Sequence, residues 1–456
     1  IAFKVFDVKQ SKLMSGSLAD EKDPSALCDP LDGASHAASV GPAPAAVTVA
    51  ASHRTPLWTL KAMQFLGTAA WACLGRFITV FYSEIGVSRQ GIGMLQFWGP
   101  IVSFLGQFFW SAVIDRRGEY KRTLVGTTII GSCIAFCHLL PAVQESFTIL
   151  MLVTVLWNFF LCTGGPVIDA LCLTVLSEQN VTEEDFGDQR LWCAVGWGGM
   201  SLIAGQMIDW FGLPFMFFGF AAIQSLNLLV CVVWIKATPS NRRTTSNQPS
   251  SSFASSLCSL EVGWFFINIL QYGVAMSLVE NFLLVFLLED FVGTPKVLLG
   301  ASITVMCISE VPVFKYVGRL WSRRGVSLVS VITACQAVLA LRCVLYTMLP
   351  SNRPWLVLLV EPLHGITFAA MWAATVEYGQ RLAPSGATAR VQALVNGIYV
   401  QAAMGLGSLV WGSAMAEPPQ GLGFPKCFLI DAACVVVWSG VWQLGHCAIS
   451  RRRSQR

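Results

Sequence analysis

Twelve apolar runs, each about as long as a helix needs to cross the hydrocarbon of a bilayer, constrain this chain more than any other feature. Inside lipid, only helices and closed barrels satisfy all of their backbone polar groups, and uninterrupted apolar runs of this length are typical of helices. The sequence therefore predicts an all-α membrane protein. The expected spans are about Leu57–Ser83, Ile92–Ile114, Thr123–Leu140, Phe147–Leu176, Leu191–Phe211, Leu213–Ile235, Leu260–Leu288, Val297–Val317, Val326–Leu349, Trp355–Ala383, Val391–Met415 and Phe424–Cys447.

The composition favours the same class. Hydrophobic residues make up 54% and charged residues 12% of the 456 residues, and the mean hydropathy is +0.61. A soluble domain carries about 25% charged residues. The fifteen cysteines are scattered without metal-ligand spacing, so they indicate neither a disulfide framework nor a metal site. Because no nucleophile or phosphate-loop motif occurs, we expect no enzymatic activity, no cofactor and no nucleic-acid partner.

Positive charge sets the expected orientation, because Lys and Arg are retained in cytosolic loops. The loops after the even-numbered spans, with the C-terminal tail, hold seventeen Lys and Arg residues, whereas the opposite loops hold four. Both termini are therefore expected in the cytosol, in a membrane that the sequence does not identify. A glycosylation sequon, Asn180-Val181-Thr182, points the other way, but a three-residue pattern often arises by chance and we expect it unmodified.

A polar segment divides the spans into six and six. We expect residues 57–235 and 260–447 to form two six-helix bundles, joined by a cytosolic linker at residues 236–259 that is rich in Ser, Thr, Asn and Pro. Residues 1–56 have the composition of a disordered cytosolic tail, and residues 448–456 form a basic cytosolic tail. We expect a monomer in the lipid bilayer.

An internal repeat links the two halves. Ser111-Ala112-Val113-Ile114-Asp115-Arg116-Arg117-Gly118 follows span 2, and Gly318-Arg319-Leu320-Trp321-Ser322-Arg323-Arg324-Gly325 follows span 8. The pattern resembles the cytosolic loop signature of the major facilitator superfamily, with Ser111 in place of the usual Gly and Ser322 in place of the usual Asp. The resemblance implies two six-helix bundles and a cytosolic gate formed by Asp115, Arg116, Gly118, Arg323 and Arg324. The plain alternative is a pair of loops held inside by positive charge.

Asp169 lies within span 4, where a carboxylate is costly and is kept mainly to pair, to relay protons or to hold a solute. Arg190 and Trp197 are seven residues apart on one face of span 5. A guanidinium, a carboxylate and an aromatic ring together form a clamp for a polar solute. Alternatively, Arg190 anchors the cytosolic end of span 5, Asp169 pairs with it, and Trp197 packs.

The stretch from Gly164 to Ala170, with that from Phe186 to Trp197, is similar to the same region of the lactose permease group of sugar and nucleoside:proton symporters. The resemblance implies that Asp169 and Arg190 bind solute hydroxyls and that Trp197 stacks on a sugar ring. The Asp is one methylene shorter than the Glu of that group.

Four ionisable residues lie in three consecutive spans of the second half: Glu310, Arg342, Glu361 and His364. By helical rise, Arg342, Glu361 and His364 have similar depths in the outer half of the membrane, and Glu310 is deeper. An imidazole between carboxylates can pass a proton while the Arg lowers the acid's affinity for it. The alternative is salt-bridged helix packing.

Lactose permease is similar in carrying an acid in span 8, an Arg in span 9, and a His and an acid three residues apart in span 10, although here the acid precedes the His. The segments Glu310-Val311-Pro312-Val313-Phe314 and Leu363-His364-Gly365-Ile366-Thr367-Phe368 also resemble the MFS-1-like, major-facilitator-domain-containing branch. The resemblance implies proton coupling, with Glu310 and Glu361 both open as the carrier.

The leading hypothesis is secondary active transport of a small polar organic solute, sugar-like or nucleoside-like, by alternating access and with proton symport. A second hypothesis is a receptor or membrane scaffold that keeps the fold without transporting. The remaining buried charges, Arg76, Glu280, Glu377 and Asp431, either line the same cavity or form structural pairs.

Overall fold

The computed structural model is helical, and eleven of the helices in the part of the chain that it describes are long and apolar enough to cross a membrane. It describes residues 55–179, 184–235, 259–317, 321, 325–383, 388–416 and 421–454. The expected third span is present as helix α5, which is less apolar than the others because it begins with Lys121 and Arg122. The all-α membrane architecture predicted from the sequence is thus confirmed.

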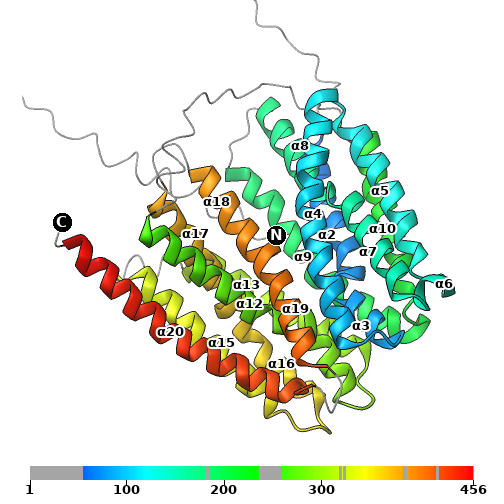
Figure 1. Ribbon diagram of the computed structural model, residues 1–456. Coiled ribbons are helices and arrows are strands. Elements are labelled where there is room, and N and C mark those ends of the chain that lie inside the picture. Colours follow the sequence, from blue (N-terminus) through cyan, green and yellow to red (C-terminus); the bar gives the residue numbers. More distant parts are fainter. Residues whose placement is uncertain are drawn as a thin grey trace, which may run out of the picture.

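The first six spans form the bundle drawn from blue to green in Figure 1, in which the span 1 helix packs on α9 and α10. Span 1 is divided into two helices, and span 4 is divided likewise. The helices are α2 (Leu57–Leu74), α3 (Phe77–Glu84), α4 (Arg89–Arg117), α5 (Tyr120–Cys137), α6 (Pro141–Gln144), α7 (Phe147–Leu161), α8 (Gly164–Glu178), α9 (Glu184–Phe211) and α10 (Phe215–Trp234).

The last six spans form the bundle drawn from green to red, in which α15 packs along α20 (Figure 1). The predicted linker lies mostly outside the described residues, so its boundaries stay a prediction. The elements are α12 (Leu260–Glu289), α13 (Lys296–Pro312), η2 (Val313–Val317), α15 (Leu328–Thr347), η3 (Pro354–Leu356), α16 (Val357–Val360), η4 (Glu361–Leu363), η5 (Gly365–Ala370), α17 (Met371–Leu382), α18 (Thr388–Asn396), η6 (Gly397–Ala403), α19 (Met404–Ala414) and α20 (Phe424–Ser454).

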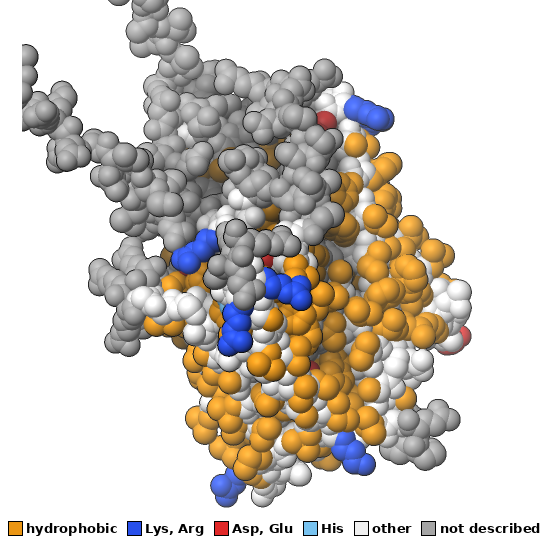
Figure 2. All heavy atoms as spheres, turned by 60° about the vertical axis from the view of Figure 1, so that its left-hand side comes forward, with side chains coloured by type: hydrophobic (Ala, Val, Ile, Leu, Met, Phe, Trp, Pro, Cys, Tyr) orange, Lys and Arg blue, Asp and Glu red, His pale blue; other side chains and the backbone are white. Residues whose placement is uncertain are grey.

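The outer surface suits a lipid environment. Hydrophobic side chains cover most of the described surface in Figure 2, and a few Lys and Arg side chains interrupt them. Large apolar side chains such as Phe108, Leu359 and Leu444 are more than half exposed. Because hydrocarbon surrounds such side chains in a bilayer, their exposure carries no hydrophobic penalty there.

Among the spans that depart from regular α-helix, spans 1 and 10 do so at charged groups that lie close together in the structure. Span 1 breaks at Gly75 and Arg76, between α2 and α3. Span 10 passes through a 3₁₀ turn at Glu361–Leu363 and a π-helical segment at Gly365–Ala370. Pro362 contributes to this irregularity because it has no N–H to give to the helix ladder. Irregular backbone inside a span is tolerated where it is buried in protein, and it often marks a functional region.

The two bundles approach most closely at glycines. A Cβ atom at Gly93 of α4 would collide with the Ser408 carbonyl of α19, and one at Gly205 of α9 would collide with the Lys296 carbonyl of α13. Gly300 of α13 meets the backbone of α9 in the same way. Small residues at helix crossings allow such backbone contact. The crossings α4 with α19 and α9 with α13 therefore form a tight interface between the bundles.

The sequence repeat has a structural counterpart. Gly118 ends α4 with φ +69°, and its N–H donates to the Ile114 carbonyl over 2.7 Å. Gly325, at the equivalent place in the second copy, has φ +63°. Glycine is favoured at both places because a left-handed residue there ends the helix without strain.

Candidate functional site

A fully buried ion pair lies in the second bundle. The Arg342 Nη2 atom of α15 donates to Glu361 Oε2 over 2.6 Å, and both side chains are 0% exposed. The second carboxylate oxygen of Glu361 accepts from the Tyr346 hydroxyl over 3.2 Å. Both oxygens of Glu361 therefore have donors, as a carboxylate removed from water requires.

His364 lies beside this pair. Arg342 Nη1 is 3.0 Å from His364 Nδ1 and donates to Thr367 Oγ1 over 3.2 Å. A guanidinium has no acceptor, so Nδ1 must accept, which makes the imidazole neutral with its proton on Nε2. That nitrogen lies 3.2 Å from Glu310 Oε1. The sequence-predicted Glu310, Arg342, Glu361 and His364 are thus brought together.

The local fold of span 10 positions these groups. The 3₁₀ turn sets Glu361 and His364 toward α15 and α13, and the Gly365 N–H donates to Ser309 Oγ of α13 over 3.0 Å. A side chain at Gly365 would collide with the Ser309 carbonyl. Phe368 stacks on the imidazole with ring centroids 5.3 Å apart. The ring of His364 is therefore held on its edge by hydrogen bonds and on its face by packing.

A second ion pair joins the two bundles. Arg76, at the break in span 1, contacts Glu280 of α12 through Nη2 and Oε2, and its Nη1 atom lies 3.2 Å from the Met306 sulfur. Glu280 Oε1 is 3.7 Å from His364 Nδ1. The sequence analysis left open whether Arg76 and Glu280 line the same cavity or form a structural pair, and it did not predict that they contact each other. The available signal was their charge within apolar runs, but no periodicity relates residues 204 positions apart.

In the first bundle, Asp169 of α8 is half-buried and accepts from Gln64 Nε2 of α2 over 3.1 Å. Gln64 Oε1 in turn lies 2.9 Å from the Cys193 thiol of α9. Gln64 is thus a further polar contact of Asp169 that the sequence analysis missed. Arg190 belongs to α9, but its side chain lies outside the described residues, so its expected pairing with Asp169 stays a prediction.

Trp197 packs against the break in span 1. A Cβ atom at Gly75 would lie 2.5 Å from Trp197 Cη2 and 2.9 Å from the Trp71 carbonyl. The indole therefore uses the space that glycine leaves open, directly beside Arg76. This contact connects the predicted clamp with the ion pair that joins the bundles.

The predicted cytosolic gate is only partly described. Asp115, Arg116 and Gly118 are exposed at the end of α4, whereas Arg323 and Arg324 lie outside the described residues. Arg116 in the last turn is stabilised by the helix dipole. The role of these five residues as a gate stays a prediction, as does modification of the sequon, because residues 180–183 are also outside the described part.

Polar contacts join the bundles at the predicted outer end. Lys296 of α13 pairs with Glu84 over 2.5 Å, and Arg89 of α4 pairs with Glu289 of α12 over 2.7 Å. The Asp209 carboxylate of α9 accepts from the Lys296 and Val297 N–H groups over 2.7 and 2.8 Å. An acidic side chain at a helix N-terminus satisfies free N–H groups and compensates the dipole. These contacts hold the two bundles together at this end.

The two remaining buried acids have local partners. Glu377 accepts from the Trp321 indole over 3.1 Å and from Arg381 over 2.5 Å. Asp431 of α20 accepts from the Cys343 thiol over 3.4 Å. Both arrangements are the structural pairs that the sequence analysis kept as one alternative.

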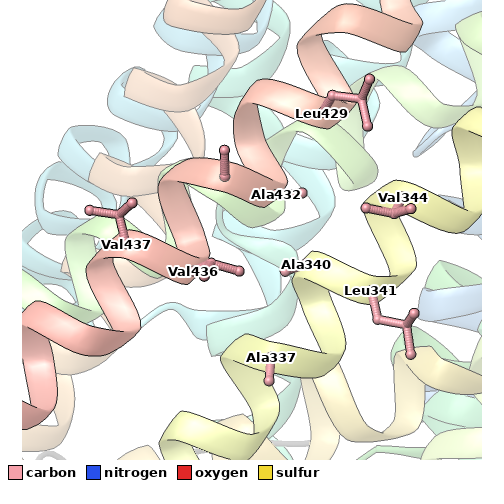
Figure 3. Close-up of a pocket in the computed structure, with 9 residues that line it drawn as sticks. Ala337, Ala340, Leu341, Val344, Leu429, Ala432, Val436 and Val437 are labelled. Carbon is pink, nitrogen blue, oxygen red and sulfur yellow. The ribbon is translucent and has the colours of Figure 1, made fainter.

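A groove of about 580 Å³ between α15 and α20 is lined by Ala, Val and Leu side chains (Figure 3). Leu341, Leu429 and Val436 on its walls are about half exposed, so the groove opens toward the surrounding lipid. A polar solute would lose its hydrogen bonds there without replacement. The groove is therefore not a candidate site for such a solute.

Known proteins resemble this chain over most of its length. Residues 57–419 match the model of the MFS_1 like family. The maltose permease of Geobacillus stearothermophilus is 24% identical over 351 residues, which cover 75% of this chain and 83% of the permease.

Solved transporters share the fold. The nucleoside transporter NupG superposes with a TM-score of 0.72 at 15% identity, covering 86% of this chain and 98% of NupG. A variant of the peptide transporter POT superposes with a TM-score of 0.65 at 12% identity, covering 88% of this chain and 98% of that one. The predicted two-bundle fold is thereby confirmed. Because these proteins are named for sugar, nucleoside and peptide cargo, the shared fold does not select a substrate.

Proposed function

The chain belongs to the MFS_1 like family, and from that premise we propose that it is a proton-coupled symporter of a small polar organic solute, sugar-like or nucleoside-like. The family and the fold make it a multi-pass membrane transporter. The solute class, the coupling to protons and the site residues are the proposal.

The observation that carries the coupling is the position of His364. Its neutral imidazole accepts from Arg342, and its Nε2 atom lies 3.2 Å from Oε1 of Glu310, whose side chain is 18% exposed, so a titratable chain connects a buried cation with a partly accessible carboxylate. An imidazole changes charge within the physiological range more readily than other side chains, and intramembrane ionisable groups of this kind serve proton relays. Glu310 is the preferred entry point, since Glu361 is sealed by Arg342 and Tyr346.

The first bundle supplies groups for the solute. Asp169 is half-buried and accepts from the Gln64 amide, and Trp197 presents an indole beside the break in span 1. A carboxylate and an amide bind hydroxyls, and an indole covers the apolar face of a ring. We propose that Arg190 completes this clamp from the same face of α9 as Trp197.

Alternating access follows from the contacts between the bundles. The pairs of Glu84 with Lys296 and Arg89 with Glu289 hold the predicted outer end together. We propose that these pairs separate when the outer end opens and that the bundles rock at the glycine crossings. Rocking of two repeats about a midplane site is a common form of secondary transport.

The experiment begins with ligand-induced thermal stabilisation of the purified full chain by maltose, uridine, a dipeptide and an amine. A ligand present at a hundred times its Kd stabilises the folded state by about 2.7 kcal/mol. We expect a sugar or nucleoside to stabilise the wild type and to lose this effect in Trp197→Ala and in Asp169→Asn. The matched control is Trp210→Ala, because Trp210 lies on the same helix and is 66% exposed.

The stabilising compound is then tested for uptake into proteoliposomes with and without a pH gradient. Symport predicts that the gradient drives accumulation. Binding without uptake would instead favour the receptor or scaffold alternative, and uptake that ignores the gradient would contradict proton coupling. A compound that stabilises wild type and Trp197→Ala equally would contradict the assignment of the clamp.

A further inference from the structure

One oxygen of Glu280 is buried without a partner. Its Oε2 atom contacts Arg76 of the other bundle, whereas Oε1 is inaccessible and has no hydrogen-bond partner among the described residues. Every hydrogen-bonding position of a buried carboxylate is costly to leave empty. A buried acceptor without a donor at this place is a position at which a proton or another hydrogen-bond donor can bind during transport.

The surroundings of Glu280 are charged. His364 Nδ1 lies 3.7 Å from the free oxygen, beyond hydrogen-bond distance, and already accepts from Arg342. Glu310 lies on the far side of the imidazole, at Nε2. The titratable and charged groups that face this region come from the break in span 1, α13, α15, span 10 and η6; they are Arg76, Cys307, Glu310, Arg342, Glu361, His364 and Tyr399.

Glu361 does not compete for this role. Its two oxygens are occupied by Arg342 and by Tyr346, and its side chain is 0% exposed. Glu280 keeps one oxygen free, and its side chain is 20% exposed. Of the acids close to His364, Glu280 also forms the described ion pair to the first bundle.

We infer that Glu280 is a proton-binding site at the interface of the bundles, and that a proton bound at Oε1 releases Arg76. An O–H bond forms at Oε1 while the corresponding bond of the donor, a hydronium ion from the aqueous phase, breaks and leaves water, so the charge of the pair changes from zero to +1. A neutral carboxyl attracts the guanidinium far less than a carboxylate does. Proton binding therefore weakens a contact that holds the two bundles together. This inference rests on the proposed function, because it assigns one residue of the proposed coupling.

Arg76 also lies beside the predicted clamp. The ring of Trp197 packs against Gly75, the residue before Arg76. A solute against Trp197 and a proton on Glu280 consequently act on adjacent residues of span 1. The break in this span, with Arg76 at the start of α3, is the structural element that both ligands reach.

The test measures proton binding directly and needs no transported solute. Infrared difference spectra of the full chain in liposomes, recorded between acidic and alkaline buffer, report the C=O stretch of protonated carboxyl groups. We expect a titrating band that Glu280→Gln removes. Asp431→Asn is the matched control, because Asp431 is a buried acid of the same bundle with the Cys343 thiol, and no cation, as its described hydrogen-bond donor. Glu310→Gln should also leave the band of Glu280 in place.

A folding control accompanies the spectra. The double substitution Arg76→Met with Glu280→Gln removes both charges together and should fold, because no buried charge remains without its partner. The double variant should also lack the titrating C=O band assigned to Glu280. The same titrating bands in wild type and Glu280→Gln, loss in Asp431→Asn of the band assigned to Glu280, or the absence of any titrating band would overturn the inference. Wild-type uptake that ignores a pH gradient would instead contradict the proposed symport, which is measured separately.

Discussion

Asp169 in the first bundle and Glu361 in the second are both acids within membrane spans, but their surroundings differ. Asp169 is half-buried, and its described hydrogen bond comes from the neutral amide of Gln64. Glu361 is 0% exposed and is held by Arg342 and Tyr346. A carboxylate that stays partly accessible has acceptor capacity for a solute, whereas one enclosed by donors fixes the structure around it.

The difference extends to the two regions as a whole. Trp197 packs on Gly75 so closely that an added Cβ atom there would lie 2.5 Å from its ring. The second-bundle groups form a continuous network from Glu310 through His364 and Arg342 to Glu361. We propose recognition for the first-bundle groups and electrostatic order for the second-bundle network. Four predictions test that assignment.

The largest effect is expected from Arg342→Met. This change leaves the charge of Glu361 buried without its counter-ion, which typically costs about 3–5 kcal/mol. We expect a strongly lowered melting temperature of the purified chain, followed by intrinsic fluorescence. The double variant Arg342→Met with Glu361→Gln should regain most of the loss, because it removes both charges. Equal losses in the single and double variants would show that packing, and not charge, holds this region.

His364→Gln should change coupling more than stability. Glutamine can still accept and donate, but it cannot carry a proton at physiological pH. We expect uptake of the stabilising solute driven by a pH gradient to fall to simple equilibration, while solute exchange at equal pH continues. His446→Gln, in α20, is the matched histidine control. Full accumulation of the solute by the His364→Gln variant would contradict the proposal that His364 takes part in proton coupling.

Gly75→Ala probes the first bundle. The added Cβ atom would displace the Trp197 ring and press on the Trp71 carbonyl, and such overpacking costs about 1–3 kcal/mol. We expect weaker binding of the stabilising solute in titrations. Gly126→Ala, in α5, has open space around its Cβ and should be neutral or stabilising by about 0.5–1 kcal/mol. An unchanged affinity of Gly75→Ala for the solute would contradict the proposal that Trp197 contacts it.

The smallest effect is expected from Glu119→Gln. Glu119 pairs with Arg122 over 2.6 Å, but the two side chains are 42% and 82% exposed. Exposed pairs contribute under about 1 kcal/mol, and salt screens them. The melting temperature should be nearly unchanged at low and high salt. A loss as large as that of Arg342→Met would show that exposure does not distinguish the two ion pairs.

The sequence predicts the membrane fold well because its signals are local. The length of the apolar runs gives the spans. The repeat around Gly118 and Gly325 relates the two halves, and both glycines have the left-handed conformation in the structure. The break at Gly75 and the 3₁₀ and π segments of span 10 were not expected. They depend on contacts with neighbouring helices, such as Trp197 on Gly75, which hydropathy does not encode.

The candidate site was predictable only in part, because the sequence indicates the depth of a residue in its span but not its contacts with other helices. Helical rise places Arg342, Glu361 and His364 at one depth, and the structure brings them into contact. Depth does not determine which acid faces which side of the imidazole. Rotation of the helices about their axes places Glu280 near Nδ1 of His364, while Arg342 and Tyr346 enclose Glu361. Gln64 was missed because an uncharged polar residue is a weak signal in an apolar run.

The glycine crossings between the bundles have a consequence for the sequence changes that the protein tolerates. At Gly93, Gly205 and Gly300 an added Cβ atom would meet backbone atoms of the other bundle. Side-chain volume, and not polarity, governs substitution at these three positions. In the proposed alternating access the crossings would permit motion without driving it, and the free energy would come from proton and solute binding elsewhere. Loss of function at the glycines would consequently be steric, insensitive to pH and salt, and separable from defects of the ionisable groups.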